Sequence, residues 1–136
     1  MTTGPGPGPE TSDHPPGSFS VAVTGGGEGP LVATVAGDVD IATASSMGAT
    51  VIAAMEDAPG SGVVLDFANV GFMDSTGLRA VLDISRRLET GPGSLVLLSP
   101  NRPVRKLLSL AGLDDRMPIA ETLAEARTML AEAAQP

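Results

Sequence analysis

The residue types best suited to chemistry or recognition gather in one short stretch, in which residues 74–78 read Asp-Ser-Thr-Gly-Leu. This stretch follows an apolar run at residues 63–67 and precedes a helical pattern, so the Ser75 hydroxyl is expected in the first turn of a helix. A serine there can be a nucleophile, cap the helix by accepting a backbone N–H, or accept a phosphoryl group. Asp74 competes with Ser75 for the capping role.

A nucleophilic serine would need a general base, and the sequence offers none in a suitable place. There is no Cys, and the single His14 lies in a Pro/Gly-rich stretch, which excludes a thiol nucleophile, a disulfide framework and a thiolate or histidine metal site. Ser75 is not in a Gly-x-Ser-x-Gly elbow, and the glycine-rich residues 25–30 lack the Lys-Ser/Thr ending of a phosphate-binding loop. A serine hydrolase and a nucleotide hydrolase are therefore disfavoured alternatives. We expect a protein that is not an enzyme and that needs no cofactor or metal.

The charges are unevenly distributed along the chain, whose formal net charge is -8. No Lys or Arg precedes Arg79, and all eight basic residues lie from there onward. An acidic protein of this kind is poorly suited to nucleic acid, because binding to phosphates requires Lys and Arg. We expect instead a protein partner with a positively charged surface.

The elements that position Ser75 are predicted from hydrophobic periodicity. Strands are predicted at residues 19–23, 31–36, 63–67, 94–98 and 117–120, and each strand after the first is followed by a helix. Asp40 is the predicted N-cap of the first helix, whose apolar stripe would begin at Ile41. The order β-β-α-β-α-β-α-β-α indicates an α/β fold with about five strands in a mixed sheet and about four helices packed on it. Because the sequence has three Phe and no Trp or Tyr, the core must be aliphatic.

Composition divides the chain into two parts. Residues 1–17 are rich in Pro and Gly and are predicted to be a disordered tail, whereas residues 18–136 form one domain. No apolar run reaches the ~18 residues of a membrane span, and the N-terminal residues lack the pattern of a signal peptide. We expect a cytoplasmic protein that does not bind a membrane.

Three segments resemble the STAS-domain family, and within it the bacterial anti-sigma factor antagonists. Residues 37–40 read Gly-Asp-Val-Asp, residues 72–78 read Phe-Met-Asp-Ser-Thr-Gly-Leu, and residues 107–113 read Leu-Leu-Ser-Leu-Ala-Gly-Leu. The resemblance covers about residues 18–134 and implies the STAS-type mixed sheet. Many relatives have Gly after the Leu of the second segment, where this chain has Arg79.

The resemblance also implies a mechanism. Such an antagonist binds an anti-sigma factor serine kinase, which then releases its sigma factor. Phosphorylation of the serine that matches Ser75 breaks the complex, and a PP2C-type phosphatase restores the antagonist. A second possibility within the family is a STAS component of a lipid-transport or transporter complex, or of a sensory assembly.

The residues expected to bind the partner lie in the first two of these segments and at Arg79. They are Gly37, Asp38, Asp40, Phe72, Met73, Asp74, Ser75, Thr76, Gly77 and Arg79. Of Phe72 and Met73, one is expected to enter the core and the other to add apolar area to the partner site. We expect the protein to be a monomer or a weak dimer.

Overall fold

The computed structural model describes residues 18–27, 29–91 and 93–134, which contain five strands and four helices. Their order confirms the predicted β-β-α-β-α-β-α-β-α arrangement. The elements are β1 (Ser20–Gly25), β2 (Leu31–Val39), α1 (Ala44–Asp57), β3 (Val63–Met73), α2 (Ser75–Glu89), β4 (Leu95–Leu98), α3 (Arg102–Leu110), β5 (Ile119–Ala120) and α4 (Leu123–Ala133). The predicted tail at residues 1–17 lies outside the described residues.

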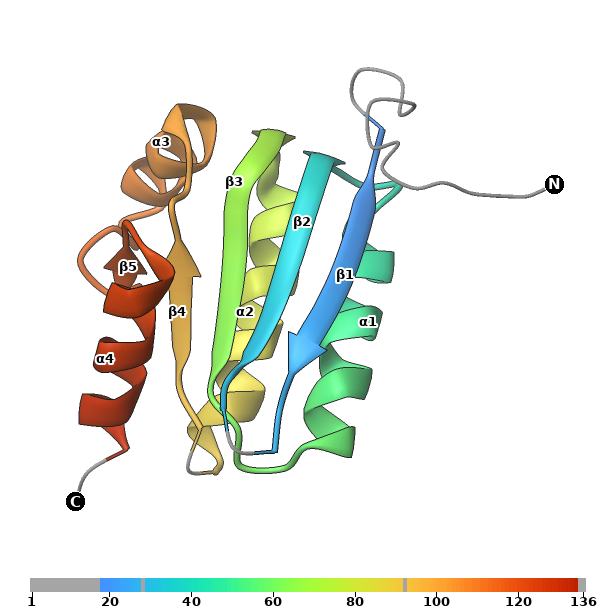
Figure 1. The fold of residues 1–136 in the computed structure, drawn as a ribbon. Coiled ribbons are helices and arrows are strands. Elements are labelled where there is room, and N and C mark those ends of the chain that lie inside the picture. The colour runs from blue at the N-terminus through green and yellow to red at the C-terminus, as the bar shows by residue number, and fades with distance from the viewer. Residues whose placement is uncertain (1–17, 28, 92, 135–136) are drawn as a thin grey trace, which may run out of the picture.

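The strands form one mixed sheet in the order β1-β2-β3-β4-β5 (Figure 1). β1 is antiparallel to β2 and joined to it by the glycine-rich turn, with Gly25 opposite Leu31. All other neighbouring strands are parallel. The carboxyl ends of β2 and β3 therefore meet at the same edge of the sheet, where Figure 1 shows both arrowheads.

Two apolar layers explain why the central strands read as continuous apolar runs. Val63, Leu65 and Phe67 of β3 face a large cluster shared with α1, α2 and α3. Val64 faces a smaller cluster, to which α4 contributes Ala126. Figure 1 accordingly shows α1 and α2 behind the sheet and α4 in front of it. A strand covered on both faces needs apolar side chains on both faces.

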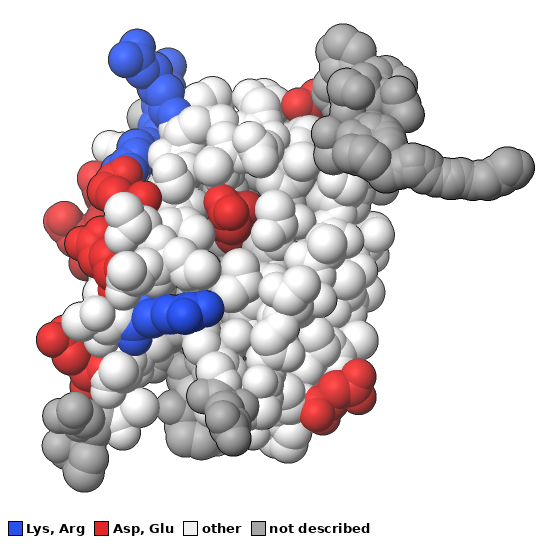
Figure 2. All heavy atoms as spheres, viewed as in Figure 1, with Lys and Arg blue, Asp and Glu red and all other residues white. Residues whose placement is uncertain are grey.

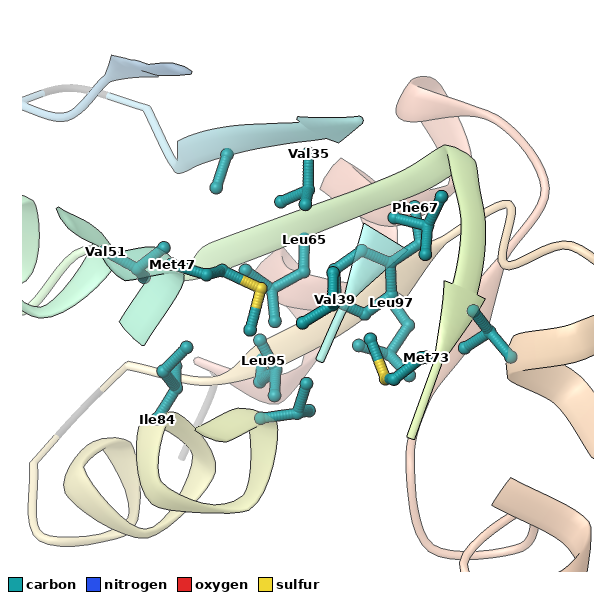
Figure 3. Packing of buried hydrophobic residues seen from close by; sticks show 14 of the residues in the cluster. Val35, Val39, Met47, Val51, Leu65, Phe67, Met73, Ile84, Leu95 and Leu97 are labelled. Carbon is teal, nitrogen blue, oxygen red and sulfur yellow. The ribbon is translucent and has the colours of Figure 1, made fainter. Parts of the chain in front are cut away.

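The larger cluster is almost purely aliphatic, as expected. Figure 3 shows Val35, Val39, Met47, Leu65 and neighbouring side chains filling the space between the sheet and the helices. Among the described residues, no polar or charged residue is buried as a whole. The core thus supplies packing, and the polar residues remain at the surface, where the site lies.

β3 is longer than predicted. The residues expected to form a short connection after Phe67 continue the strand to Met73. They do so because the end of β2 pairs with them: Gly37 lies opposite Val70 and Val39 opposite Met73, across two register shifts. The long strand carries the chain directly to the start of α2.

The ends of α3 follow the short-range signals in the sequence. Asn101 is its N-cap residue, and Pro103 lies in the first turn. At the other end Gly112 has a φ of 73°, and its N–H donates to the oxygen of Ser109. Leu113 N–H donates to the oxygen of Leu108. This pair of bonds is the Schellman motif, with Gly112 as the C′ residue.

Candidate functional site

The first two of the three segments that carry the resemblance, residues 37–40 and 72–78, lie side by side at the carboxyl edge of the sheet. Asp38 is paired with Phe72 and Val39 with Met73 in the parallel ladder of β2 and β3. Beyond the ladder, Asp74 N–H donates to the Val39 oxygen at 3.2 Å. The acidic end of β2 is therefore fixed against the turn that leads to Ser75.

Asp74, and not Ser75, caps α2. Its carboxylate accepts hydrogen bonds from Thr76 N–H at 2.9 Å and from Gly77 N–H at 3.1 Å. This is the side-chain cap that satisfies two of the free N–H groups at a helix start. The choice between Asp74 and Ser75 that the sequence leaves open is thus decided for Asp74.

Ser75 is the first residue of α2, and its side chain is exposed. Within the described part of the chain its hydroxyl makes no hydrogen bond to another protein group. Thr76, the next residue, is half-buried. The Ser75 hydroxyl is therefore free for an external reaction, and its modification would break no internal contact.

The prediction that Asp40 caps α1 is wrong. The helix begins at Ala44, with Thr43 as its N-cap residue and no side-chain cap. The Asp40 carboxylate instead accepts a bond from Ala42 N–H at 3.0 Å, which closes a local turn. The Thr43 hydroxyl donates to the Asp38 oxygen at 2.8 Å and accepts from Asp40 N–H at 2.9 Å. The Thr43 side chain thus holds a polar turn between β2 and α1, and residues 40–43 lie outside the helix.

The prediction that Ile41 begins the apolar stripe of the first helix is also wrong. Ile41 was expected in the buried stripe of the first helix, but it stands in the turn before α1 and is 81% exposed. Phe72, on the adjacent strand, is 48% exposed. Two large apolar side chains are therefore exposed at this edge of the sheet, one from the turn after β2 and one from the end of β3. The Asp-x-x-Thr spacing of Asp40 and Thr43 was the available signal for a turn here.

Three of the residues expected to bind the partner, Gly37, Met73 and Gly77, pack closely within the domain. Met73 is 4% exposed and points into the core, as Figure 3 shows. Gly77 is buried, and a β-carbon there would lie 2.8 Å from Cγ1 of Val39 and 2.9 Å from its oxygen. Gly37 has a φ of 92°, and its β-carbon would lie 1.8 Å from the Ser18 oxygen. These residues shape the site because only Phe72 of the Phe-Met pair remains accessible and both glycines allow close backbone packing.

Arg79 lies one turn beyond Ser75 on α2 and is exposed. It borders a shallow groove between α1 and α2 that small side chains line, among them Gly48, Ala49 and Ala80. In the described residues Arg79 forms no ion pair; the two ion pairs found there are Arg86–Asp83 and Arg105–Glu121.

Charge is sparse over much of the face shown in Figure 2, and it gathers toward the side of α3 and α4 seen in Figure 1. No group of three or more His, Cys, Asp or Glu residues in the described parts of the chain is placed to hold a metal ion. No helix among the described residues has the length and apolar character needed to cross a membrane.

Comparison with known proteins identifies the arrangement. The sequence model of the STAS domain matches residues 22–126. The anti-sigma F factor antagonist of Paenibacillus polymyxa is 29% identical over 102 residues, which cover 75% of this chain and 87% of that protein.

Three solved structures show the same fold. An anti-sigma factor antagonist from Mycobacterium paratuberculosis superposes with a TM-score of 0.73 at 28% identity, covering 87% of this chain and 98% of the other. Unphosphorylated SpoIIAA, an anti-sigma factor antagonist, superposes with a TM-score of 0.71 at 26% identity, covering 83% and 97%. SpoIIAA of Bacillus has also been solved in a phosphorylated form, with a TM-score of 0.62 and 27% identity. With its five-stranded mixed sheet, its four helices and a family match over most of its length, this chain belongs to the STAS-domain family.

Proposed function

We propose that this chain is an anti-sigma factor antagonist that binds an anti-sigma factor serine kinase and so releases a sigma factor. Phosphorylation of Ser75 ends the binding. This proposal rests on the different roles of Asp74 and Ser75 at the start of α2. Asp74 caps the helix, which leaves the exposed Ser75 hydroxyl without an internal role. The relatives named as anti-sigma factor antagonists support the same function.

The surface around Ser75 is suited to a protein partner. Ile41 and Phe72 offer exposed apolar area, and large apolar side chains are the usual anchors of protein interfaces. Asp38 pairs with Phe72 in the strand ladder, and Asp40 and Asp74 follow the ends of the same two strands, so this edge of the sheet is acidic. We therefore propose that the kinase presents basic residues, which would accelerate association and set the orientation.

Phosphorylation would weaken kinase binding because it adds negative charge to the contact surface and because the phosphate would have to lose its bound water. The γ-phosphoryl group of ATP passes to Oγ of Ser75, its bond to the β-phosphate oxygen breaks, ADP leaves, and the hydroxyl proton is taken up by the kinase or solvent. The product carries about -1.5 to -2 charge at neutral pH on an already acidic surface. A penalty of roughly 3–4 kcal/mol would weaken the complex about 100- to 1000-fold.

In this proposal the protein is a substrate and a binding partner, and it has no catalytic role. A PP2C-type phosphatase would hydrolyse the phosphoserine and restore binding. Because the kinase, ATP and the sigma factor act together, we place the protein in the cytoplasm. It would act as a monomer or a weak dimer.

The test is to incubate the purified full chain with candidate anti-sigma factor kinases and ATP and to locate the phosphate by mass spectrometry. We expect phosphate on Ser75 and none on the Ser75→Ala variant, while Ser109→Ala, which removes an exposed serine of α3, is modified like the wild type. Calorimetric titration should then show tight kinase binding by the unmodified chain and about 100-fold weaker binding by the phosphorylated chain. Equal affinities, or phosphate found only at other residues, would overturn the proposal.

A further inference from the structure

Asp74 reduces the number of backbone N–H groups that could bind a phosphate on Ser75. A helix start normally offers free N–H groups to an anion. Here the Asp74 carboxylate already occupies two of them, those of Thr76 and Gly77. The phosphate would also follow that carboxylate directly along the chain, with Asp38 at the end of the neighbouring strand and Asp40 in the turn after it. With fewer free N–H groups left at the helix start, a basic side chain is the main source of counter-charge for the phosphate.

Arg79 is placed to supply this charge. It lies four residues after Ser75 on α2, and residues at this spacing are neighbours on a helix surface. Long side chains on a helix lean toward its N-terminus, which directs Arg79 back over the turn that holds Ser75. Both residues are exposed, so neither has to leave the core for the pair to form.

Asp83, the other acid four residues from Arg79, competes poorly with a phosphate on Ser75 for this arginine. Asp83 lies four residues further along α2, but it pairs with Arg86 at 3.8 Å. The order of charges matters as well, because an anion N-terminal to its cation is the more favourable arrangement at this spacing. A phosphate at Ser75 has the favourable order with Arg79, and Asp83 has the unfavourable one.

We propose that Arg79 is the intramolecular partner of the phosphate on Ser75, free in the unmodified protein and engaged after phosphorylation. This inference rests on the proposed function in one respect, namely that Ser75 is the phosphorylated residue. Arg79 also borders the groove between α1 and α2, where it is accessible to a bound protein before phosphorylation. Phosphorylation thus has two effects on the partner surface: it adds a negative group and withdraws a positive one.

The test uses the full chain with phosphoserine incorporated at position 75 during translation, which requires no kinase. Phosphorus NMR follows the titration of the phosphate between its singly and doubly charged forms. A nearby cation favours the doubly charged form and so lowers the pKa. We expect the Arg79→Gln variant to raise that pKa by about 0.2 to 0.4 units over the wild type, because the doubly charged form carries one more negative charge that an exposed arginine can stabilise.

The matched control is Arg87→Gln, which removes an exposed arginine from the same helix and leaves the pair of Asp83 and Arg86 in place. Its phosphate should titrate like that of the wild type, and Arg79→Lys should lie closer to the wild type than Arg79→Gln. The acids Asp38, Asp40, Asp74 and Asp83 are unchanged in all these proteins, so their effects on the phosphate cancel in the comparison. A titration that is the same for Arg79→Gln and wild type, or a shift as large for Arg87→Gln, would overturn the inference.

The outcome of the NMR titration is independent of the outcome of the kinase-binding test. If the NMR shift depends on Arg79 but phosphorylation leaves kinase binding unchanged, the proposed function fails and the pair stands. If phosphorylation abolishes kinase binding but the shift does not depend on Arg79, the switch stands and this inference fails.

Discussion

Gly77 and Val39 join α2 to the end of β2 at a distance that leaves no room for a side chain. A β-carbon on Gly77 would lie 2.8 Å from Cγ1 of Val39 and 2.9 Å from the Val39 oxygen. The same oxygen accepts the N–H of Asp74 at 3.2 Å. Gly77 therefore allows the helix start, with Ser75 on it, to stand against the acidic end of β2.

Replacing Gly77 by Ala should destabilise the protein although alanine is the better helix former. The added methyl group meets backbone as well as side chains, so α2 must move away from β2, at a cost of about 1–3 kcal/mol. Urea unfolding followed by circular dichroism measures this loss. The control is Gly91→Ala, at a position where a β-carbon meets nothing within 4 Å. Equal stability of Gly77→Ala and wild type would show that the close contact is not required.

Replacing Asp74 by Ala should cost about 1 kcal/mol, the usual effect of losing an N-cap side chain. The carboxylate holds two N–H groups that no other described side chain reaches. Asp74→Asn and Asp74→Ser keep a capping oxygen and should retain most of the stability. If all three variants unfold at the same urea concentration as the wild type, the cap contributes nothing.

The sequence predicts those parts of the fold that depend on short-range patterns. The helix at Ser75 starts at the predicted position because its capping residue lies next to the apolar stripe. The burial of β3 on both faces could also be predicted, since no polar residue interrupts residues 63–65. In each case neighbouring residues alone carry the signal.

What could not be predicted depends on partners far along the chain or on competing local bonds. The extension of β3 to Met73 requires the end of β2 beside it, which periodicity within one segment does not show. The turn before α1 depends on Thr43, whose hydroxyl bonds the Asp38 oxygen and competes with a helical start at Asp40. Ile41 fits the helical spacing, yet this turn leaves it in solvent.

Replacing Ser75 by Ala should leave stability within about 0.5 kcal/mol of the wild type, because its hydroxyl makes no internal hydrogen bond. Kinase binding by Ser75→Ala should persist, whereas Ser75→Glu should bind less tightly because it adds a negative charge. The two measurements are urea unfolding and calorimetric titration with the kinase. A loss of stability comparable to that of Asp74→Ala would show that Ser75 has a structural role after all.

Replacing Ile41 by Ser should weaken kinase binding about 10-fold while leaving stability nearly unchanged. The side chain is 81% exposed, so little apolar burial is lost from the folded monomer. In a complex, however, an anchor of this size contributes at least about 1.4 kcal/mol, which corresponds to a factor of ten. The matched control is Leu110→Ser, because Leu110 is 76% exposed at the end of α3. If both variants bind the kinase like the wild type, Ile41 lies outside the interface, and the partner surface must be confined to the strand end and the start of α2.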